Sequence, residues 1–398
     1  SLSQGSSILS SKIYKVVYTV SNYIEGGVYV RVGNSGIGTT RQENGTFTEY
    51  ITQSGNTTIY FTAYSGSTTL SIDNVSVKEV ISATNTPRID YSTGVEAFLL
   101  EPQSTNLVTY SSDFSSLDIR NNAVVTSNAI ISPSGILDAD EITFNGTSAG
   151  RVQTSISVTI GQPYTISLYL KNKDLSDFTQ VWIGFSATSQ GQFVTITDEW
   201  QRYDITTNAD GTIEYPRIQF SGTGSLYAWG FQAEQQSYPT SYIPTDGASA
   251  TRNQETCIDA TPTINSEEGV LYAEISALAD DLTNRAISLS DGTFNNGIQI
   301  EYFNVSNRIR FRVYAGGVLQ QTNQVIGITI TNTNKLALRW ESGFMTVYIN
   351  GSILNTTQAI SSTPTGLDKL RFDLGQGSSK FYGNTKGLQV FDKALSDY

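Results

Sequence analysis

Five side chains in the middle of the chain have the chemistry of a sugar-binding surface. Residues alternate between apolar and polar or aromatic over 164–171, 180–185 and 216–220. In β-strands this pattern turns the apolar side chains inward and leaves the others on the opposite face. The side chains left facing out are Tyr169, Lys171, Trp182, Arg217 and Gln219. Aromatic rings pack on the C–H face of a pyranose, while charged and amide groups hydrogen-bond its hydroxyls. We therefore expect a saccharide site on an open sheet, with Trp182 beside Arg217.

Trp182 also has a structural interpretation, which is the one that we favour, because tandem modules often pack large side chains under a loop or a neighbouring domain. Three other tryptophans are expected to have packing roles. Trp200 and Trp229 occupy positions where a related segment has Phe47 and Ile72, and Trp340 continues an apolar alternation. These three side chains are not predicted to touch a ligand.

Three arginines alternate on one segment of the C-terminal third. Arg308, Arg310 and Arg312 would share a strand face, with Glu301 on the preceding strand. Three guanidinium groups on one face suit an acidic glycan, but cross-strand pairing with Glu301 and other carboxylates is the alternative that we favour.

Catalytic patterns are missing from the sequence. Histidine is absent, which excludes Ser-His-Asp and Cys-His nucleophile systems and the HExxH zinc motif. Glycoside hydrolysis needs two positioned carboxylates. No E-x-D-x-x-E run occurs, and the acidic residues at 138–141 lack the required spacing. We expect that the chain is not an enzyme.

Composition excludes several partners. The chain has 398 residues and a formal charge of −12, with no basic cluster, so nucleic-acid binding is not expected. No apolar run is long enough to cross a bilayer, and no signal peptide precedes the first strand. The lone Cys257 excludes an internal disulfide. The chain begins inside what reads as an incomplete domain, so we interpret it as a fragment of a longer protein.

Period-two alternation predicts strands throughout the chain, for example at 14–20, 58–63, 335–340 and 345–349. Hairpin turns are predicted at Asn-Gly and Asp-Gly pairs beginning at Asn44, Asn145, Asp210, Asn296 and Asn350. Helical periodicity of useful length is missing. The predicted fold is all-β, built from tandem antiparallel β-sandwiches of the jelly-roll type.

A sequence repeat defines the modules. Residues 14–21, 28–32 and 45–52 match 164–171, 181–185 and 198–206 in order and character. A repeat of this size indicates a folded unit that is used twice. The predicted organisation is a truncated sandwich at 1–81, a linker at 82–105, a second sandwich at 106–235, a linker at 236–263, and a sandwich of different plan at 264–398.

Three stretches carry a resemblance to known proteins. PRIDYSTG at 87–94 followed by LLEPQSTNL at 99–107, and GFQAE at 230–234 followed by SYPTSYIPT at 237–245, resemble the linker and module end of bacteriophage tail-fibre and virion surface proteins built from carbohydrate-binding modules. WESGFMTVYING at 340–351 with FDKALS at 391–396 is similar to the concanavalin A-like, or laminin-G-like, sandwich. The resemblance implies recognition of host-surface glycans, although its motifs are scaffold residues.

The resemblance also raises a calcium site, because many lectin-like sandwiches bind calcium through loops. The loop 291–297 could supply oxygen ligands from Asp291 and Asn295. The favoured alternative is a plain hairpin turn rich in Asn and Gly. No other cofactor is predicted.

The function expected from the sequence is a non-catalytic, glycan-binding adhesion component of a phage virion, located on the virion surface outside the cell. Its expected partners are a host surface polysaccharide and other virion or fibre proteins, with a homotrimer as one possible assembly. Two alternatives stay open. The chain could be a structural spacer or decoration protein without a ligand site, or the binding portion of a depolymerase whose catalytic domain lies elsewhere.

Overall fold

The computed structural model describes residues 2–395 except 6–12, 35, 54, 56, 65, 81–87, 92–93, 174–178, 186–189, 259 and 355–357. Regular structure in these ranges is β-strand, apart from a three-residue 3-10 helix, η1 (Phe114–Ser116). Every strand pair in the sheets is antiparallel, so the predicted all-β, antiparallel class is confirmed. In the described ranges no helix has the length and apolar character needed to cross a bilayer. The chain divides into two compact units, 1–83 and 84–398.

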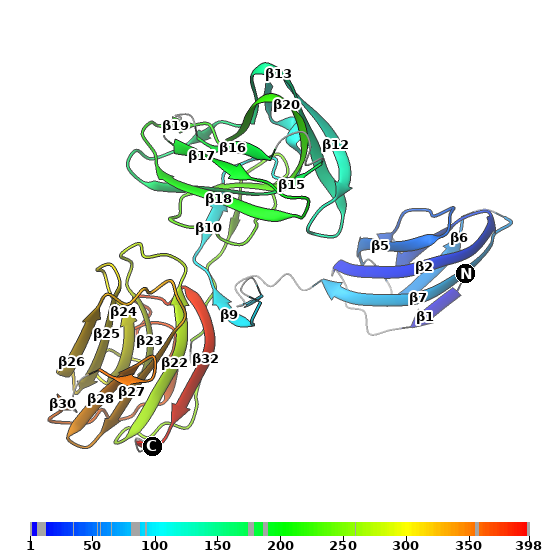
Figure 1. The fold of residues 1–398 in the computed structure, drawn as a ribbon. Helices are drawn as coiled ribbons and strands as arrows, with labels where there is room; N and C mark the ends of the chain where they lie inside the picture. The colour runs from blue at the N-terminus through cyan, green and yellow to red at the C-terminus, as the bar shows by residue number, and fades with distance from the viewer. Residues whose placement is uncertain are drawn as a thin grey trace. The chain divides into compact units, whose positions relative to one another are not determined.

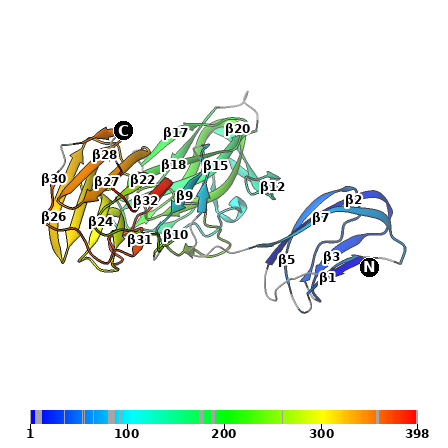
Figure 2. The same ribbon diagram turned by 90° about the horizontal axis from the view of Figure 1, so that it is seen from below.

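The first module, residues 1–83, has two small sheets. One has the order β5-β2-β7 and the other β1-β6-β3-β4. Figure 2 shows β2 and β7 along one side of this module with β1 and β3 opposite. Val16, Tyr18 and Val30 are buried between the sheets. The strands are β1 (Leu2–Gly5), β2 (Ile13–Glu25), β3 (Val28–Val32), β4 (Gly36–Ile37), β5 (Gly45–Thr52), β6 (Thr58–Ala63) and β7 (Thr69–Val80).

The middle module, residues 104–252, is built around two long strands, β13 and β20, which pair along most of their length and curve together in Figure 1. The first half of β20 pairs with β16, and its second half pairs with β15. The strands are β10 (Ser104–Asn106), β11 (Asp118–Arg120), β12 (Ala123–Ile131), β13 (Leu137–Gln153), β14 (Ile156–Ser157), β15 (Pro163–Asn172), β16 (Gln180–Gly184), β17 (Gly191–Thr195), β18 (Gln201–Asn208), β19 (Ile213–Glu214), β20 (Arg217–Glu234) and β21 (Ala250–Arg252).

The strand order of the middle module corresponds to that of the first module. The order β5-β2-β7 corresponds to β18-β15-β20, and β4-β3-β6 corresponds to β17-β16-β20. The separate strands β6 and β7 of the first module are thus replaced by the two halves of β20. One turn prediction is wrong, because Asn145 and Gly146 lie inside the long strand β13.

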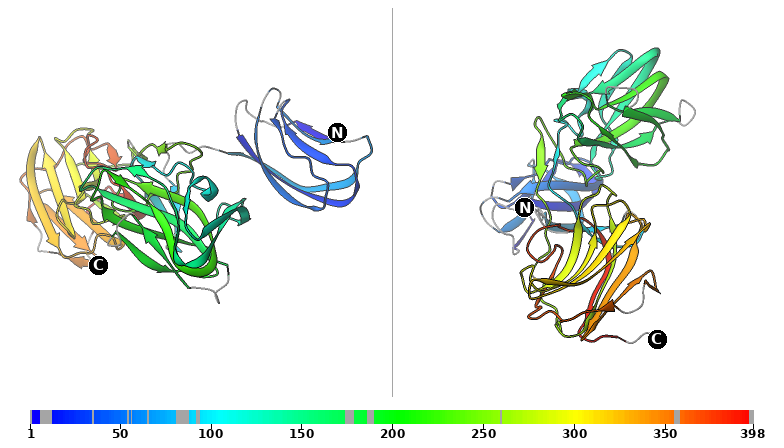
Figure 3. Two further views of the ribbon diagram at one scale, coloured as in Figure 1. Left: turned by 90° about the horizontal axis from the view of Figure 1, so that it is seen from above. Right: turned by 90° about the vertical axis from the view of Figure 1, so that its left-hand side faces the viewer.

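The C-terminal module, residues 88–100 and 254–395, has two large sheets. One has the order β29-β28-β27-β22-β32-β9-β8, with β30 beside β28, and the other β26-β25-β24-β23-β31. Figure 3 shows these yellow-to-red strands curving in two layers. Trp340 is fully buried between them, as predicted. The strands are β8 (Arg88–Asp90), β9 (Ala97–Leu100), β22 (Gly269–Ala277), β23 (Arg285–Ser290), β24 (Gly297–Tyr302), β25 (Arg308–Ala315), β26 (Val318–Ile326), β27 (Asn334–Glu341), β28 (Phe344–Ile349), β29 (Ser352–Ile353), β30 (Gln358–Ala359), β31 (Lys369–Arg371) and β32 (Gly383–Phe391).

The two predicted linkers contain ordered structure. In 82–105, of which 82–87 and 92–93 lie outside the described residues, β9 pairs with β32 and extends the C-terminal sheet. In 236–263, β21 pairs with β10 from the first linker. Buried carboxylates join the two segments. Glu101 binds Arg88, accepts a 2.8 Å hydrogen bond from the Ser241 N–H, and lies 3.0 Å from Arg252. Paired strands and buried ion pairs therefore hold the two predicted linker segments together.

Candidate functional site

The inward faces of the middle module match the alternation in the sequence. Phe220, which was also predicted to face inward, is only half-buried, but most of the side chains predicted to face inward have no exposed surface and pack into a single core. The fully buried ones are Ile166, Leu168, Leu170, Val181, Ile183, Phe185 and Ile218. The alternate residues of β16 and β20 must therefore project from the outer face of their sheet.

Three of the five predicted side chains lie together on this outer face. Trp182 of β16 is paired with Gln219 of β20, and Gly184 is paired with Arg217. The Arg217 guanidinium carbon lies 4.9 Å from the centroid of the Trp182 ring, within cation–π range. Trp182 and Arg217 are therefore side by side, as the sequence predicted.

The prediction that Trp182 and Arg217 are exposed to solvent is wrong. Trp182 is 6% exposed and Arg217 is 8% exposed. Two glycines explain why the indole is buried. A Cβ atom built on Gly191 or on Gly184 would overlap the indole, and the Cβ atom on Gly184 would lie 2.6 Å from its Cη2 atom. The ring therefore fills the space that two side chains would otherwise occupy, and Arg217 packs on it. Trp182 forms part of the surface layer instead of projecting into water.

Gly191→Ala tests this arrangement. Its backbone φ is not in the left-handed region, but the added methyl group would lie 2.0 Å from Cζ2 of the indole and 2.6 Å from the Ile183 carbonyl oxygen, so it must displace the ring or the backbone. Overpacking of this kind costs about 2 kcal/mol. We expect a lower free energy of unfolding and a changed near-ultraviolet circular dichroism signal of the tryptophans. Gly66→Ala is the control, since an added Cβ there meets nothing within 4 Å. Equal stability of both variants would contradict the described packing.

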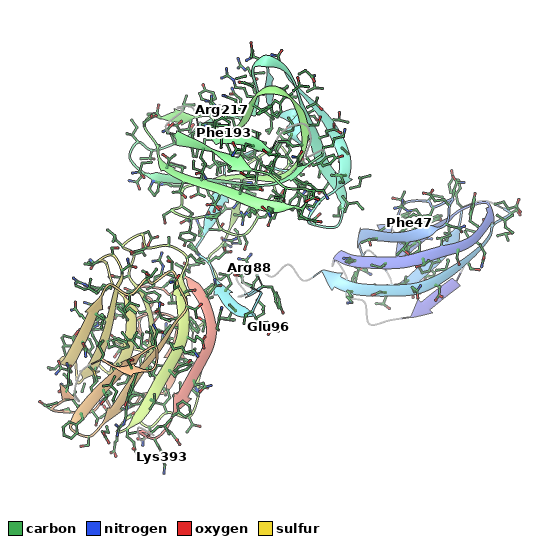
Figure 4. The ribbon with its side chains drawn as sticks, in the orientation of Figure 1. Phe47, Arg88, Glu96, Phe193, Arg217 and Lys393 are labelled. Atoms are coloured by element: carbon green, nitrogen blue, oxygen red, sulfur yellow. The ribbon has the colours of Figure 1, made fainter. Side chains whose placement is uncertain are left out.

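The exposed aromatic residue of this face is Phe193, which sequence reasoning missed. Phe193 of β17 is paired with Trp182, and it is 63% exposed. Figure 4 labels it together with Arg217 on the same side of the module. The alternation in the sequence could have identified it. Val194 and Ile196 are buried in the core, so Phe193, at the alternate position, must point to the outer face. The hairpin register that places Phe193 next to Trp182 was not predicted.

On the other side of Gln219, the face continues onto β13 and β11. Arg151 is paired with Gln219, and Gln153 is paired with Arg217. Asp118 of β11 accepts a 3.0 Å hydrogen bond from the Gln153 side chain and lies 2.8 Å from the guanidinium of Arg120. One row across four strands thus contains a phenyl ring, an indole, an amide and a guanidinium group. We call the row Phe193, Trp182, Gln219 and Arg151, together with Arg217, the aromatic–arginine face.

Two charged groups on and beside this face have shifted pKa values. Burial, and secondarily the neighbouring Arg151, lowers the pKa of Arg217, though an arginine stays charged at neutral pH. Burial acts to raise the pKa of Asp118, but hydrogen bonds from Arg120 and Gln153 outweigh it and hold that pKa below its usual value. The face therefore carries cationic donors at one end and an exposed ring at the other.

Tyr169 and Lys171 do not belong to the aromatic–arginine face. Both are on β15, which pairs with the second half of β20, whereas β16 pairs with the first half. The Tyr169 ring lies 5.5 Å from Trp229, and Trp229 lies 4.5 Å from Tyr242. Half-buried Lys171 is paired with Tyr227. Period-two parity identified the outer faces but could not show that the bent strand β20 separates them.

The remaining tryptophans of this module pack against protein. Trp229 is buried in the aromatic cluster just described, in agreement with its predicted packing role. The prediction for Trp200 is wrong in part, because its side chain is only half-buried. Its indole N–H donates a 3.1 Å hydrogen bond to the Ile131 carbonyl.

In the C-terminal module the arginines pair with protein, as favoured. The Arg310 Nε donates a 2.7 Å hydrogen bond to Glu301, and Arg312 donates one of 3.2 Å to the same oxygen. Arg310 also lies 3.4 Å from the centroid of the Phe303 ring. Arg308 donates to the Gln324 side chain. Arg310 and Arg312 are thus part of the fold's own ion pairing, whereas Arg308 bonds to a neutral amide.

The loop that carries Asp291 and Asn295 does not fit a calcium site. Asp291 accepts hydrogen bonds from the Thr293 N–H at 2.9 Å, the Thr293 hydroxyl at 2.6 Å and the Asn296 amide at 2.9 Å. Burial acts to raise the pKa of Asp291, but these bonds outweigh it and lower that pKa. In the part of the chain that the structure describes, no three His, Cys, Asp or Glu side chains are grouped to hold a metal ion. The geometry is that of a self-bonded turn.

No protein-family model and no curated protein sequence matches the chain. Two of the matching solved structures are sheep galectin-11 in complex with glycerol and domains LG4-5 of the mouse laminin alpha1 chain. Each has 8% sequence identity and a TM-score of 0.25. The galectin match covers 34% of this chain and 96% of that one, and the laminin match covers 71% and 93%. Scores this low carry no conclusion about function, so the sandwich architecture rests on the sheets described above.

Proposed function

We propose that the chain is a non-catalytic glycan-binding protein that uses the aromatic–arginine face to hold a saccharide. The observation that carries the proposal is Phe193, whose ring is 63% exposed beside the stacked pair of Trp182 and Arg217. An exposed phenylalanine at this position adds little to the fold, but it offers a flat apolar surface to the C–H face of a sugar. Gln219 and Arg151 are next in the row. Their side chains would donate hydrogen bonds to hydroxyl or carboxylate oxygens of the saccharide.

Packing gives this face the rigidity that a binding surface needs. Gly184 and Gly191 set the position of the indole, and the indole in turn stacks with Arg217. Little side-chain entropy would therefore be lost when a ligand binds. A shallow face of this kind binds weakly by itself, and display of many copies would raise the apparent affinity.

We further propose that this binding serves adhesion of a phage virion to host surface polysaccharide, with the protein on the virion surface and with other virion or fibre proteins as partners. The support is the linker and module-end sequences described above, together with the repeated module. A homotrimer is one assembly that would supply the required multivalency. We propose that the C-terminal module is a concanavalin A-like sandwich within the same protein.

A glycan array tests the proposal with the intact chain and with Phe193→Ala. We expect retention of at least one class of polysaccharide and a loss of at least ten-fold in affinity for the variant, because the stacking surface is removed while the core is untouched. Phe344→Ala is a matched control, since Phe344 is also an exposed phenylalanine, at 48%, but belongs to the C-terminal module. It should bind like the unmodified chain.

The same assay separates the alternatives. A chain that retains no glycan on any array would be a spacer or decoration protein, and the proposal would be wrong. Retention that is unchanged in Phe193→Ala would place the site elsewhere. Release of new reducing ends from a host polysaccharide by the chain would contradict its non-catalytic assignment.

A further inference from the structure

A cavity of about 390 Å³ lies in the middle module, away from the aromatic–arginine face. Its volume is within the range of small-molecule sites, roughly 300–1,000 Å³. Its walls come from β10 with the residues beside it, from the β14–β15 region, and from the residues that follow β20. Side chains that line it include Gln103, Leu107, Ser157, Thr159, Tyr164 and Gln235.

The lining is polar but carries no ionised side chain. Amides and hydroxyls dominate it, Leu107 supplies apolar surface, and the buried Tyr164 contributes its hydroxyl. The nearest buried acid, Glu234, is already used by the fold. It accepts 2.6 Å hydrogen bonds from the hydroxyls of Ser104 and Thr240. The walls therefore offer an ionised ligand no opposite charge.

Several polar groups on the walls remain available to a ligand. Among the described residues, no hydrogen bond involves the side-chain amide of Gln103 or the hydroxyls of Ser157 and Thr159. The Tyr164 hydroxyl donates a 3.3 Å hydrogen bond to Gln235 Oε1 and accepts one of 2.9 Å from the Thr159 N–H. This orients Gln235 and leaves its NH₂ group as a donor. Donors and acceptors therefore converge on a concave space with an apolar wall.

We propose that this cavity binds one uncharged sugar unit, as a site separate from the aromatic–arginine face. Hydroxyl groups of the sugar would exchange hydrogen bonds with Gln103, Ser157 and Gln235, and its C–H surface would contact Leu107. Neutral amides and hydroxyls can hydrogen-bond the vicinal hydroxyls of a sugar, and the sugar does not need to carry a charge. The aromatic–arginine face is open and cationic in comparison, so the two sites select different parts of a glycan.

Saturation-transfer difference NMR on the full chain tests this site. The probes are methyl α-D-glucopyranoside, methyl α-D-galactopyranoside and methyl α-D-mannopyranoside, with glucuronic acid as the charged comparison. Ser157→Trp fills the cavity from an exposed position, and Gln235→Ala removes a donor without adding bulk. Ser361→Trp is the matched control, because Ser361 is exposed in the C-terminal module.

We expect at least one neutral glycoside to bind, with Kd raised more than ten-fold in Ser157→Trp and raised to a smaller extent in Gln235→Ala. Ser361→Trp and Phe193→Ala should bind it like the unmodified chain, which separates this site from the proposed function. The inference is wrong if no neutral glycoside binds, if Ser157→Trp leaves binding unchanged, or if glucuronic acid binds equally well.

Discussion

Replacing Trp182 with alanine is expected to abolish glycan binding at the aromatic–arginine face and also to lower the free energy of unfolding of the middle module by about 3 kcal/mol. The indole is 6% exposed and occupies the space over Gly184 and Gly191, so its removal leaves a gap that small residues cannot fill. Arg217 would lose its stacking partner at the same time. Binding would fail because Arg217 loses the ring on which it stacks and the strand position opposite Phe193 loses its aromatic side chain.

Phe193→Ala separates the two effects of Trp182→Ala. It should lose binding while its unfolding free energy changes by less than about 0.5 kcal/mol, the usual range for surface substitutions. Urea unfolding followed by far-ultraviolet circular dichroism measures stability, and titration with the glycan retained on the array measures binding. A Trp182→Ala protein that is as stable as the unmodified chain would show that the indole is not packed as described.

Glu301→Gln should destabilise the C-terminal module by about 3–5 kcal/mol. Glu301 is 1% exposed and contacts both Arg310 and Arg312, which are themselves largely buried. Glutamine retains the shape but removes the charge, so two guanidinium groups would be left in a poorly solvated position without their counter-ion. Arg310 would keep its stacking on Phe303, which cannot replace an ionic partner.

The matched control for this prediction is Glu341→Gln. Glu341 pairs with Arg339 at 2.8 Å, but its side chain is 35% exposed. Solvent screens such pairs, so the expected loss is below about 1 kcal/mol. Urea unfolding of the two variants gives the comparison. Similar losses in both would mean that burial of Glu301 does not govern its contribution to stability.

Much of the fold was predictable because local chemistry encodes it. Period-two alternation in 164–171 and 181–185 identified which side chains enter the core, and each of those faces is buried as expected. The repeated order of strands in the first two modules was visible in sequence for the same reason. Ion pairing of Arg310 with Glu301 followed from their positions on adjacent strands.

The candidate site was only partly predictable. Sequence parity placed Trp182, Arg217 and Gln219 on an outer face, and the strand register brings them together. Parity also assigned Tyr169 to that face, although Tyr169 packs on Trp229. Phe193 was not selected, because its importance depends on a cross-strand partner that lies eleven positions away in the sequence.

The sequence by itself determined which side chains face inward, since alternation along one strand depends on backbone geometry that neighbouring residues share. Tertiary structure decided how exposed the outward side chains are, which outer faces adjoin and where the linkers pair. The gap that Gly184 and Gly191 leave beneath the indole decides its exposure, and the bend of β20 decides which outer faces adjoin. Glu101 joins the linkers, because it binds residues from both segments. Each arises from contacts between residues distant in the chain, and no local pattern records such contacts.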